Sequence, residues 1–150
     1  AHSFITAFKN YRIQTENQRQ RHAGTYQDIG KCMDTYERLT KVKELAAYLQ
    51  SYIIVKGAWT CIVTPEGNYY FNPTGNPGMA TGGSGDVLTG ILLGLLAQGY
   101  EREDACRLGV YVHGLAGNLA AEEKTEIGMT ANDIIEALPK AWKTLTTKNR

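Results

Sequence analysis

A glycine-rich stretch that ends in an acidic residue is the part of this 150-residue chain best suited to chemistry. It spans residues 72–94 (NPTGNPGMATGGSGDVLTGILLG), and five of its glycines lie within residues 75–85, immediately before Asp86. Glycine lets the backbone approach a ligand closely, and a helix that begins near Ser84 would leave its first N–H groups unpaired. Those N–H groups and the helix dipole favour a bound anion, most often a phosphate. We therefore predict that nucleotide phosphates are bound by Thr81, Gly82, Gly83, Ser84 and Gly85.

Asp86 indicates a catalytic role, because a carboxylate beside bound phosphates would repel them and so would not serve to bind them. Its position after the glycines suits a base that accepts a proton from a hydroxyl group. Two familiar phosphate motifs are excluded. No lysine lies within residues 75–94, and Leu88 stands where the dinucleotide fingerprint requires its third glycine. The alternative is a loop whose glycines only turn the chain, with Asp86 as an ordinary residue of the first helical turn.

Composition and charge exclude several classes of protein. The net charge of +1 provides no electrostatic reason to expect a nucleic acid or an anionic membrane as a partner. The longest apolar run, residues 87–97, is too short to span a bilayer. Cys32, Cys61 and Cys106 form no CxxC pair, which is typical of reduced thiols near a core, without a disulfide framework or a zinc site. We expect a cytoplasmic protein whose side chains form no dedicated metal site.

The elements around the glycine stretch form an α/β pattern. Apolar positions predict an amphipathic helix from about residue 35 to 49, followed by a buried strand over residues 52–56, which is typical of a parallel sheet. Two further strands are predicted over residues 60–64 and 69–72, joined by a hairpin turn at residues 65–68.

The segment after the strand at residues 52–56 is a second candidate for ligand binding. In open α/β sheets, ligands bind beyond the carboxyl ends of the strands, so this segment could line a nucleotide pocket. The alternative is a tight turn with an exposed lysine and tryptophan. The residues concerned are Lys56, Gly57, Ala58, Trp59 and Thr60.

Three helices are predicted after the glycine stretch, over about residues 84–98, 102–124 and 131–144. Pro139 predicts a break or kink in the last of them. Gly90 and Gly94 form a GxxxG pattern, which we interpret as close packing of a helix on a sheet. His113 lies among apolar residues and is interpreted as a core histidine with its hydrogen bonds satisfied. Residues 1–34 show no clear period and are predicted to hold no catalytic residue, whereas residues 35–150 form the nucleotide-binding part.

Four segments of the chain, in their order and spacing, also carry a family resemblance. VKGAWT, FNPTGNPGMATGGSGDVLTGIL, GVYVHGLAG and GMTANDIIEALP resemble the C-terminal half of the ADP/ATP-dependent NAD(P)H-hydrate dehydratases, which belong to the ribokinase-like superfamily. The resemblance implies an α/β fold, namely the C-terminal portion of a three-layer sandwich with a mixed sheet and packed helices. It also implies a lyase that uses ADP or ATP, with Mg²⁺, to dehydrate NADH or NADPH whose nicotinamide ring has taken up water. On the matching positions, residues 56–60 and Gly85 hold the adenine nucleotide, and Asp86 faces the hydrated substrate.

The first part of the chain departs from the family pattern. A T-P-H segment normally precedes the helix before YIIVKG, and nothing in residues 1–34 reproduces it. We therefore expect an incomplete form of the enzyme, and a homo-oligomer that covers the missing portion. Two alternatives remain open: a kinase of the same superfamily that acts on a vitamin precursor or sugar alcohol, and a non-catalytic domain that pairs with another subunit.

Overall fold

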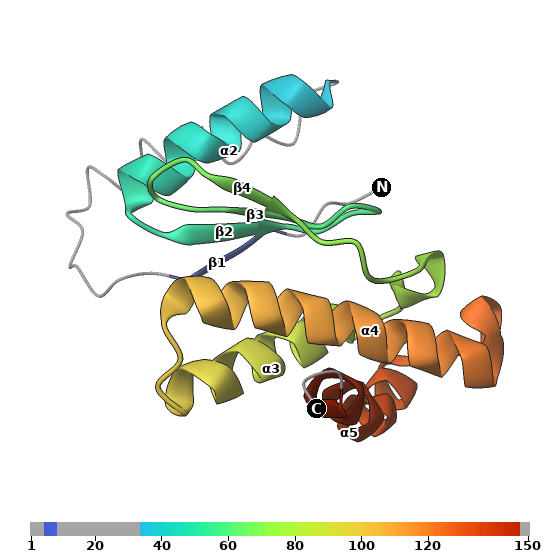
Figure 1. The fold of residues 1–150 in the computed structure, drawn as a ribbon. Coiled ribbons are helices and arrows are strands. Elements are labelled where there is room, and N and C mark those ends of the chain that lie inside the picture. Colours follow the sequence, from blue (N-terminus) through green and yellow to red (C-terminus); the bar gives the residue numbers. More distant parts are fainter. Residues whose placement is uncertain (1–4, 9–33, 148–150) are drawn as a thin grey trace. The chain divides into compact units, whose positions relative to one another are not determined.

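The computed structural model describes residues 5–8 and 34–147 and divides the chain into two compact units (Figure 1). The first unit comprises Ala1–Gly57 and Cys61–Tyr70, and the second comprises Ala58–Thr60 and Phe71–Arg150. Each unit has a hydrophobic core of its own. None of the helices within the described ranges is long and apolar enough to cross a membrane.

The described residues form a sheet of four strands in the order β1 (Ile5–Phe8), β2 (Tyr52–Val55), β3 (Cys61–Val63) and β4 (Tyr69–Phe71). β1 pairs with β2, and β2 pairs with β3, and both pairs are antiparallel. The expectation of a parallel pairing around β2 is therefore wrong for these strands. For β2 and β3 the physical reason is the short connection through residues 56–60, since a crossover between parallel strands needs a dozen residues or more. β1 lies in a part of the chain for which no element was predicted.

Among its described residues, the first unit contains the helix α2 (Thr35–Leu49), as the apolar spacing predicts. Asp34 begins it by accepting a hydrogen bond from the Tyr36 N–H at 3.2 Å, and Gln50 ends it in a left-handed conformation. The apolar face of α2 packs on one face of the sheet, which buries residues of β2 and β3 (Figure 1). This core contains Val42, Leu45, Ala46, Leu49, Ile53, Val55, Cys61 and Val63.

The turn between β3 and β4 is the hairpin that the sequence predicts. The Thr64 N–H donates to the Asn68 carbonyl at 3.0 Å, and the Gly67 N–H donates to the Thr64 carbonyl at 2.9 Å. Gly67 has a φ of 87°, a left-handed conformation that favours glycine. Local turn chemistry is thus sufficient to specify this part of the sheet.

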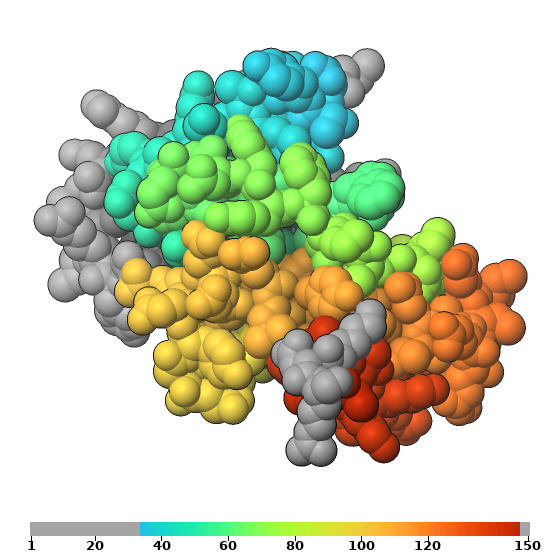
Figure 2. Space-filling model, viewed as in Figure 1, coloured from blue at the N-terminus to red at the C-terminus, as the bar shows by residue number. Residues whose placement is uncertain are grey.

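The second unit consists mainly of helices: η1 (Pro77–Met79), α3 (Ser84–Ala97), α4 (Arg102–Gly128) and α5 (Ala131–Thr147). α4 packs against both α3 and α5, and the three lie side by side in Figures 1 and 2. α4 leaves helical geometry at Thr125 (φ 67°, ψ 159°), directly after the residue at which the sequence predicts its end.

α5 does not break at Pro139, so the predicted break is wrong. Proline removes one backbone donor and crowds the preceding turn, which costs helix stability. Ile134 and Ala141, on either side of Pro139, are fully buried in the core of the second unit. We infer that this burial holds the helix together across the proline.

The start of α5 is held by a carboxylate, which makes its stability dependent on pH. Asp133 accepts hydrogen bonds from the Thr130 N–H and from the Thr130 hydroxyl, both at 2.7 Å. These bonds lower the pKa of Asp133 below its ordinary value of 3.8. A lowered folded-state pKa adds stability that is present above pH 3.8 and is lost as the pH falls through the folded-state value.

We therefore expect Asp133→Asn to unfold at a lower temperature than the wild type at neutral pH. The difference should shrink as the pH falls below 3.8, because the wild-type carboxyl then becomes protonated too. Thermal unfolding of both proteins across the acid range measures this. A difference that stayed constant with pH would show that the two hydrogen bonds do not depend on the charge.

Candidate functional site

The site is built around the glycine turn that leads into α3. Gly83 has a φ of 85°, and its carbonyl accepts hydrogen bonds from the Asp86 N–H at 3.0 Å and from the Val87 N–H at 3.1 Å. Within the described part of the chain, the N–H groups of Gly82, Gly83 and Gly85 have no hydrogen-bond partner. Unpaired N–H groups at the positive end of a helix dipole are donors for an anion. The predicted role of residues 81–85 thus has a geometric basis.

A second helix begins beside this turn. A β-carbon placed on Gly83 would lie 3.1 Å from the Cβ of Ala131, the first residue of α5. The N-termini of α3 and α5 therefore meet, and Asn132 lies next to them. Two helix dipoles with their positive ends at one point favour negative charge more than either does alone. Nothing local in residues 131–133 indicates this convergence, so the sequence does not predict it.

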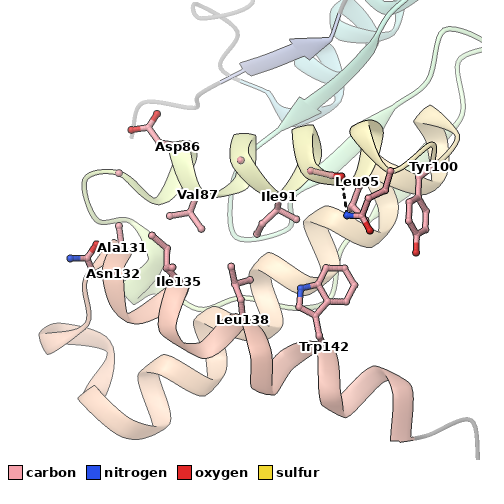
Figure 3. A pocket seen from close by; sticks show the side chains of 14 residues that line it. Asp86, Val87, Ile91, Leu95, Tyr100, Ala131, Asn132, Ile135, Leu138 and Trp142 are labelled. Carbon is pink, nitrogen blue, oxygen red and sulfur yellow. Dashed lines mark hydrogen bonds between the residues drawn. The ribbon is translucent and has the colours of Figure 1, made fainter.

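A pocket of about 890 Å³ extends from this point between α3 and α5 (Figure 3). Gly83, Asp86 and Asn132 line it, and its walls are mainly apolar. In Figure 3 the side chains of Val87 and Ile91 point from α3 toward those of α5. The apolar wall comprises Val87, Ile91, Leu95, Ala131, Ile135, Leu138 and Trp142.

Gly90 and Gly94 also line this pocket. Among the described residues, no atom lies within 4 Å of a β-carbon placed on either glycine. The interpretation of this GxxxG pattern as close packing on a sheet stays a prediction, because the sheet belongs to the other unit. Within the second unit, the two glycines widen the pocket on the α3 side.

The Asp86 carboxylate lies at the start of α3, directly after the glycine turn. Its side chain is exposed, and no hydrogen bond or ion pair joins it to any residue in the described ranges. In Figure 3 it stands at the start of α3 and points away from α5. A carboxylate that serves neither as a cap nor as an ion-pair partner is available to accept a proton.

The loop before the turn is held against α4. The Thr74 hydroxyl donates to the Tyr111 carbonyl at 2.9 Å, and the Asn76 amide donates to the Asn118 side chain at 3.1 Å. Gly114 makes the approach possible, because a β-carbon there would clash with the Thr74 hydroxyl and lie 2.7 Å from the Thr74 carbonyl carbon. These contacts with α4 thus fix the position of the loop.

His113 connects α4 with the start of α3. Its side chain is buried, with 4% of its surface exposed, and Nε2 lies 2.9 Å from the Ser84 carbonyl oxygen. The same nitrogen is 3.4 Å from the Ser84 hydroxyl. The interpretation of His113 as a satisfied core histidine is confirmed, and its partner belongs to the predicted site.

The second predicted segment follows β2, as expected, and is divided between the two units. Lys56 and Gly57 belong to the first unit, so their shared role with the glycine turn stays a prediction. Thr60 accepts a hydrogen bond from the Asn72 N–H at 2.8 Å, which joins it to the beginning of the glycine stretch. Trp59 is 68% exposed.

The cysteines and acidic residues within the described ranges form no second candidate site. Cys61 and Cys106 are free and buried, and burial raises their pKa to about 11 and about 12, which keeps both thiols protonated at neutral pH. Cys32 lies outside the described residues. In the ranges that the structure describes, no group of three His, Cys, Asp or Glu side chains could hold a metal ion.

The fold places the chain among the ribokinase-like α/β proteins. It superposes on a ribokinase-like protein from Enterococcus faecalis with a TM-score of 0.60 and 38% identity, over 71% of this chain and 36% of the other. The chain belongs to the NAD(P)H-hydrate dehydratase family, whose model matches residues 21–140.

Similar proteins agree with this family. The chain is 39% identical to an ADP-dependent (S)-NAD(P)H-hydrate dehydratase from Bacillus subtilis, over 71% of this chain and 39% of the relative. It is 46% identical to a bifunctional NAD(P)H-hydrate repair enzyme from Thermofilum pendens, over 83% of this chain and 24% of the relative. The Bacillus subtilis dehydratase co-crystallised with ATP and Mg²⁺ superposes with a TM-score of 0.68 and 38% identity, over 73% of this chain and 39% of that one. The chain therefore spans well under half the length of these relatives.

Proposed function

We propose that this chain supplies the nucleotide-binding part, and the base, of a lyase that dehydrates hydrated NADH or NADPH at the expense of ADP or ATP. The observation that carries the proposal is the glycine turn, where three N–H groups and the neighbouring Asp86 carboxylate have no partner among the described residues. The family membership and the names of the relatives support the substrate.

In the proposed reaction, Asp86 accepts the proton of the hydroxyl group on the hydrated nicotinamide ring. The hydroxyl oxygen forms a bond to the terminal phosphorus of the nucleotide, and the bond from that phosphorus to the rest of the nucleotide breaks. The phosphate then leaves the ring with the carbon–oxygen bonding electrons. The lone pair of the ring nitrogen compensates, and loss of a proton from the neighbouring carbon restores the double bond. The backbone N–H groups of Gly82, Gly83 and Gly85 supply the positioning and charge stabilisation that phosphoryl transfer requires.

Mg²⁺ fits this site as an ion held chiefly by the nucleotide. The described part of the pocket offers one carboxylate, Asp86, and no cluster of ligands. Mg²⁺ commonly binds through substrate phosphates and waters with few protein ligands, and there it neutralises phosphate charge. We propose no side chain of the described residues as its dedicated ligand.

Binding of ADP should protect the chain against thermal unfolding, because a ligand that binds only the folded state shifts the equilibrium. At a concentration one hundred times its Kd, ADP would add about 2.7 kcal/mol to the free energy of unfolding. Adenosine serves as the matched control, since it lacks the phosphates that the glycine turn should hold. Calorimetric titration measures both ligands. Equal binding of ADP and adenosine, or no binding of ADP, would show that the turn does not bind phosphate in this chain.

The remaining expectations belong to the same proposal. The family match and the named relatives favour the dehydratase over a vitamin or sugar kinase. A cytoplasmic location and a homo-oligomer are proposed on the sequence alone. Nucleotide contacts by Lys56, Gly57, Ala58, Trp59 and Thr60 are likewise proposed on the matching family positions.

A further inference from the structure

We propose that His113 is a positioning residue for the phosphate-binding turn: its imidazole aims the Gly85 N–H at the anion. This inference rests on the proposed nucleotide site and assigns a role to a side chain that does not line the pocket. The observation behind it is the contact between His113 and the first residue of α3.

The hydrogen bond from His113 reinforces the orientation that α3 gives to the peptide group between Ser84 and Gly85. A carbonyl oxygen only accepts, so Nε2, at 2.9 Å from the Ser84 oxygen, carries a hydrogen and donates it. The peptide between Ser84 and Gly85 is planar and trans, so its C=O and N–H point in opposite directions. Holding the Ser84 oxygen toward His113 therefore holds the Gly85 N–H toward the open start of α3. That N–H is one of the three without a partner among the described residues.

Burial makes this contact difficult to replace. His113 and Ser84 are 4% and 1% exposed, so water cannot readily take the place of the imidazole. The same nitrogen approaches the Ser84 hydroxyl at 3.4 Å, so one side chain contacts two polar groups of one residue. α4 also carries Tyr111 and Asn118, which bind the preceding loop. α4 therefore holds the loop through Tyr111 and Asn118, and it holds the phosphate turn through His113.

The test compares four proteins by calorimetric titration with ADP: the wild type, His113→Phe, His113→Gln and Val112→Ala. Phenylalanine keeps the ring and removes the donor, so ADP affinity should fall roughly tenfold, as expected for a lost buried hydrogen bond. Glutamine places an N–H donor at about the reach of Nε2 and should recover most of the affinity. Val112 is fully buried beside His113 but faces the core of the second unit, so Val112→Ala should lower the melting temperature and leave affinity unchanged.

The affinity for ADP distinguishes a loss of positioning by His113 from a loss of protein stability. If His113→Phe bound ADP as the wild type does, or if His113→Gln were as weak as His113→Phe, the proposal would be wrong. Should His113→Phe fail to fold, His113→Asn replaces it, because its amide ends at the level of Nδ1 and cannot make the bond from Nε2. The same loss of affinity is then expected.

Amide hydrogen exchange keeps this inference distinguishable from the nucleotide proposal. If the wild type itself failed to bind ADP, the proposed function would fail, but the contact could still be tested. His113→Phe should then speed exchange at residues 84–87 relative to the rest of α3, whereas Val112→Ala should not. Unchanged exchange at these residues in His113→Phe would overturn the positioning role.

Discussion

Replacing Asp86 by asparagine is expected to lower turnover roughly 10²–10⁴-fold, the usual contribution of a positioned general base. The measurement requires a complete catalytic domain, for instance this chain joined to the remaining portion of its Bacillus subtilis relative. Regeneration of NADH, followed by its ultraviolet absorbance, reports the rate. Folding should change little, because Asp86 has no partner within the described residues and contributes only about 0.3–1 kcal/mol through the helix dipole.

Nucleotide affinity distinguishes a base from a binding residue. Without its charge, residue 86 no longer repels the phosphates, so Asp86→Asn should bind ADP as tightly as the wild type or slightly more tightly. A loss of ADP binding would make Asp86 a ligand of a metal ion or an anchor of the loop. Near-normal turnover would exclude it as the base.

Asp104 provides a matched control for this substitution. It is the third residue of α4, as Asp86 is of α3, and it is exposed. Asp104→Asn therefore removes the same charge from the same position of a helix that the pocket does not include. It should leave turnover and ADP affinity unchanged, so any shared effect of the two variants would reflect the helix dipole alone.

Two substitutions of glycine by alanine should change stability in opposite directions. In Gly114→Ala the new methyl group would clash with the Thr74 hydroxyl and press on its carbonyl, so the loop of residues 72–79 must shift. Overpacking of this kind costs about 1–3 kcal/mol of unfolding free energy. In Gly90→Ala the methyl group enters open space in a helix, where alanine is favoured over glycine by about 0.5–1 kcal/mol.

Chemical denaturation of the three proteins measures this difference, read from the midpoint at constant slope. Gly114→Ala should unfold at a lower denaturant concentration than the wild type, and Gly90→Ala at a higher one. Gly114→Ala should also weaken ADP binding, because the displaced loop leads directly into the phosphate turn. Equal stability of the two variants would show that α4 does not hold the loop as closely as the structure indicates.

The amino-acid sequence by itself determined the parts of this protein that depend on neighbours along the chain. Glycine conformations and hydrogen bonds across a few residues define the hairpin around Gly67 and the turn at Gly83, and both were predicted. The bounds of α2 and α3 follow from apolar spacing and local end signals. Asp86 was recognised in the same way, since a carboxylate after a glycine turn is anomalous in the sequence itself.

Contacts between distant segments were decided only by the tertiary structure. β1 exists because it pairs with β2, and an apolar run such as β2 looks alike in a parallel or an antiparallel sheet. α5 continues through Pro139 because burial on both sides outweighs a local preference. The meeting of α3 and α5 at Gly83, and the bond from His113 to Ser84 across 29 positions, likewise come from packing. The free energy of such contacts cannot be inferred from spacing along the chain. The glycine turn could therefore be predicted, whereas its contacts with α4 and α5 could not.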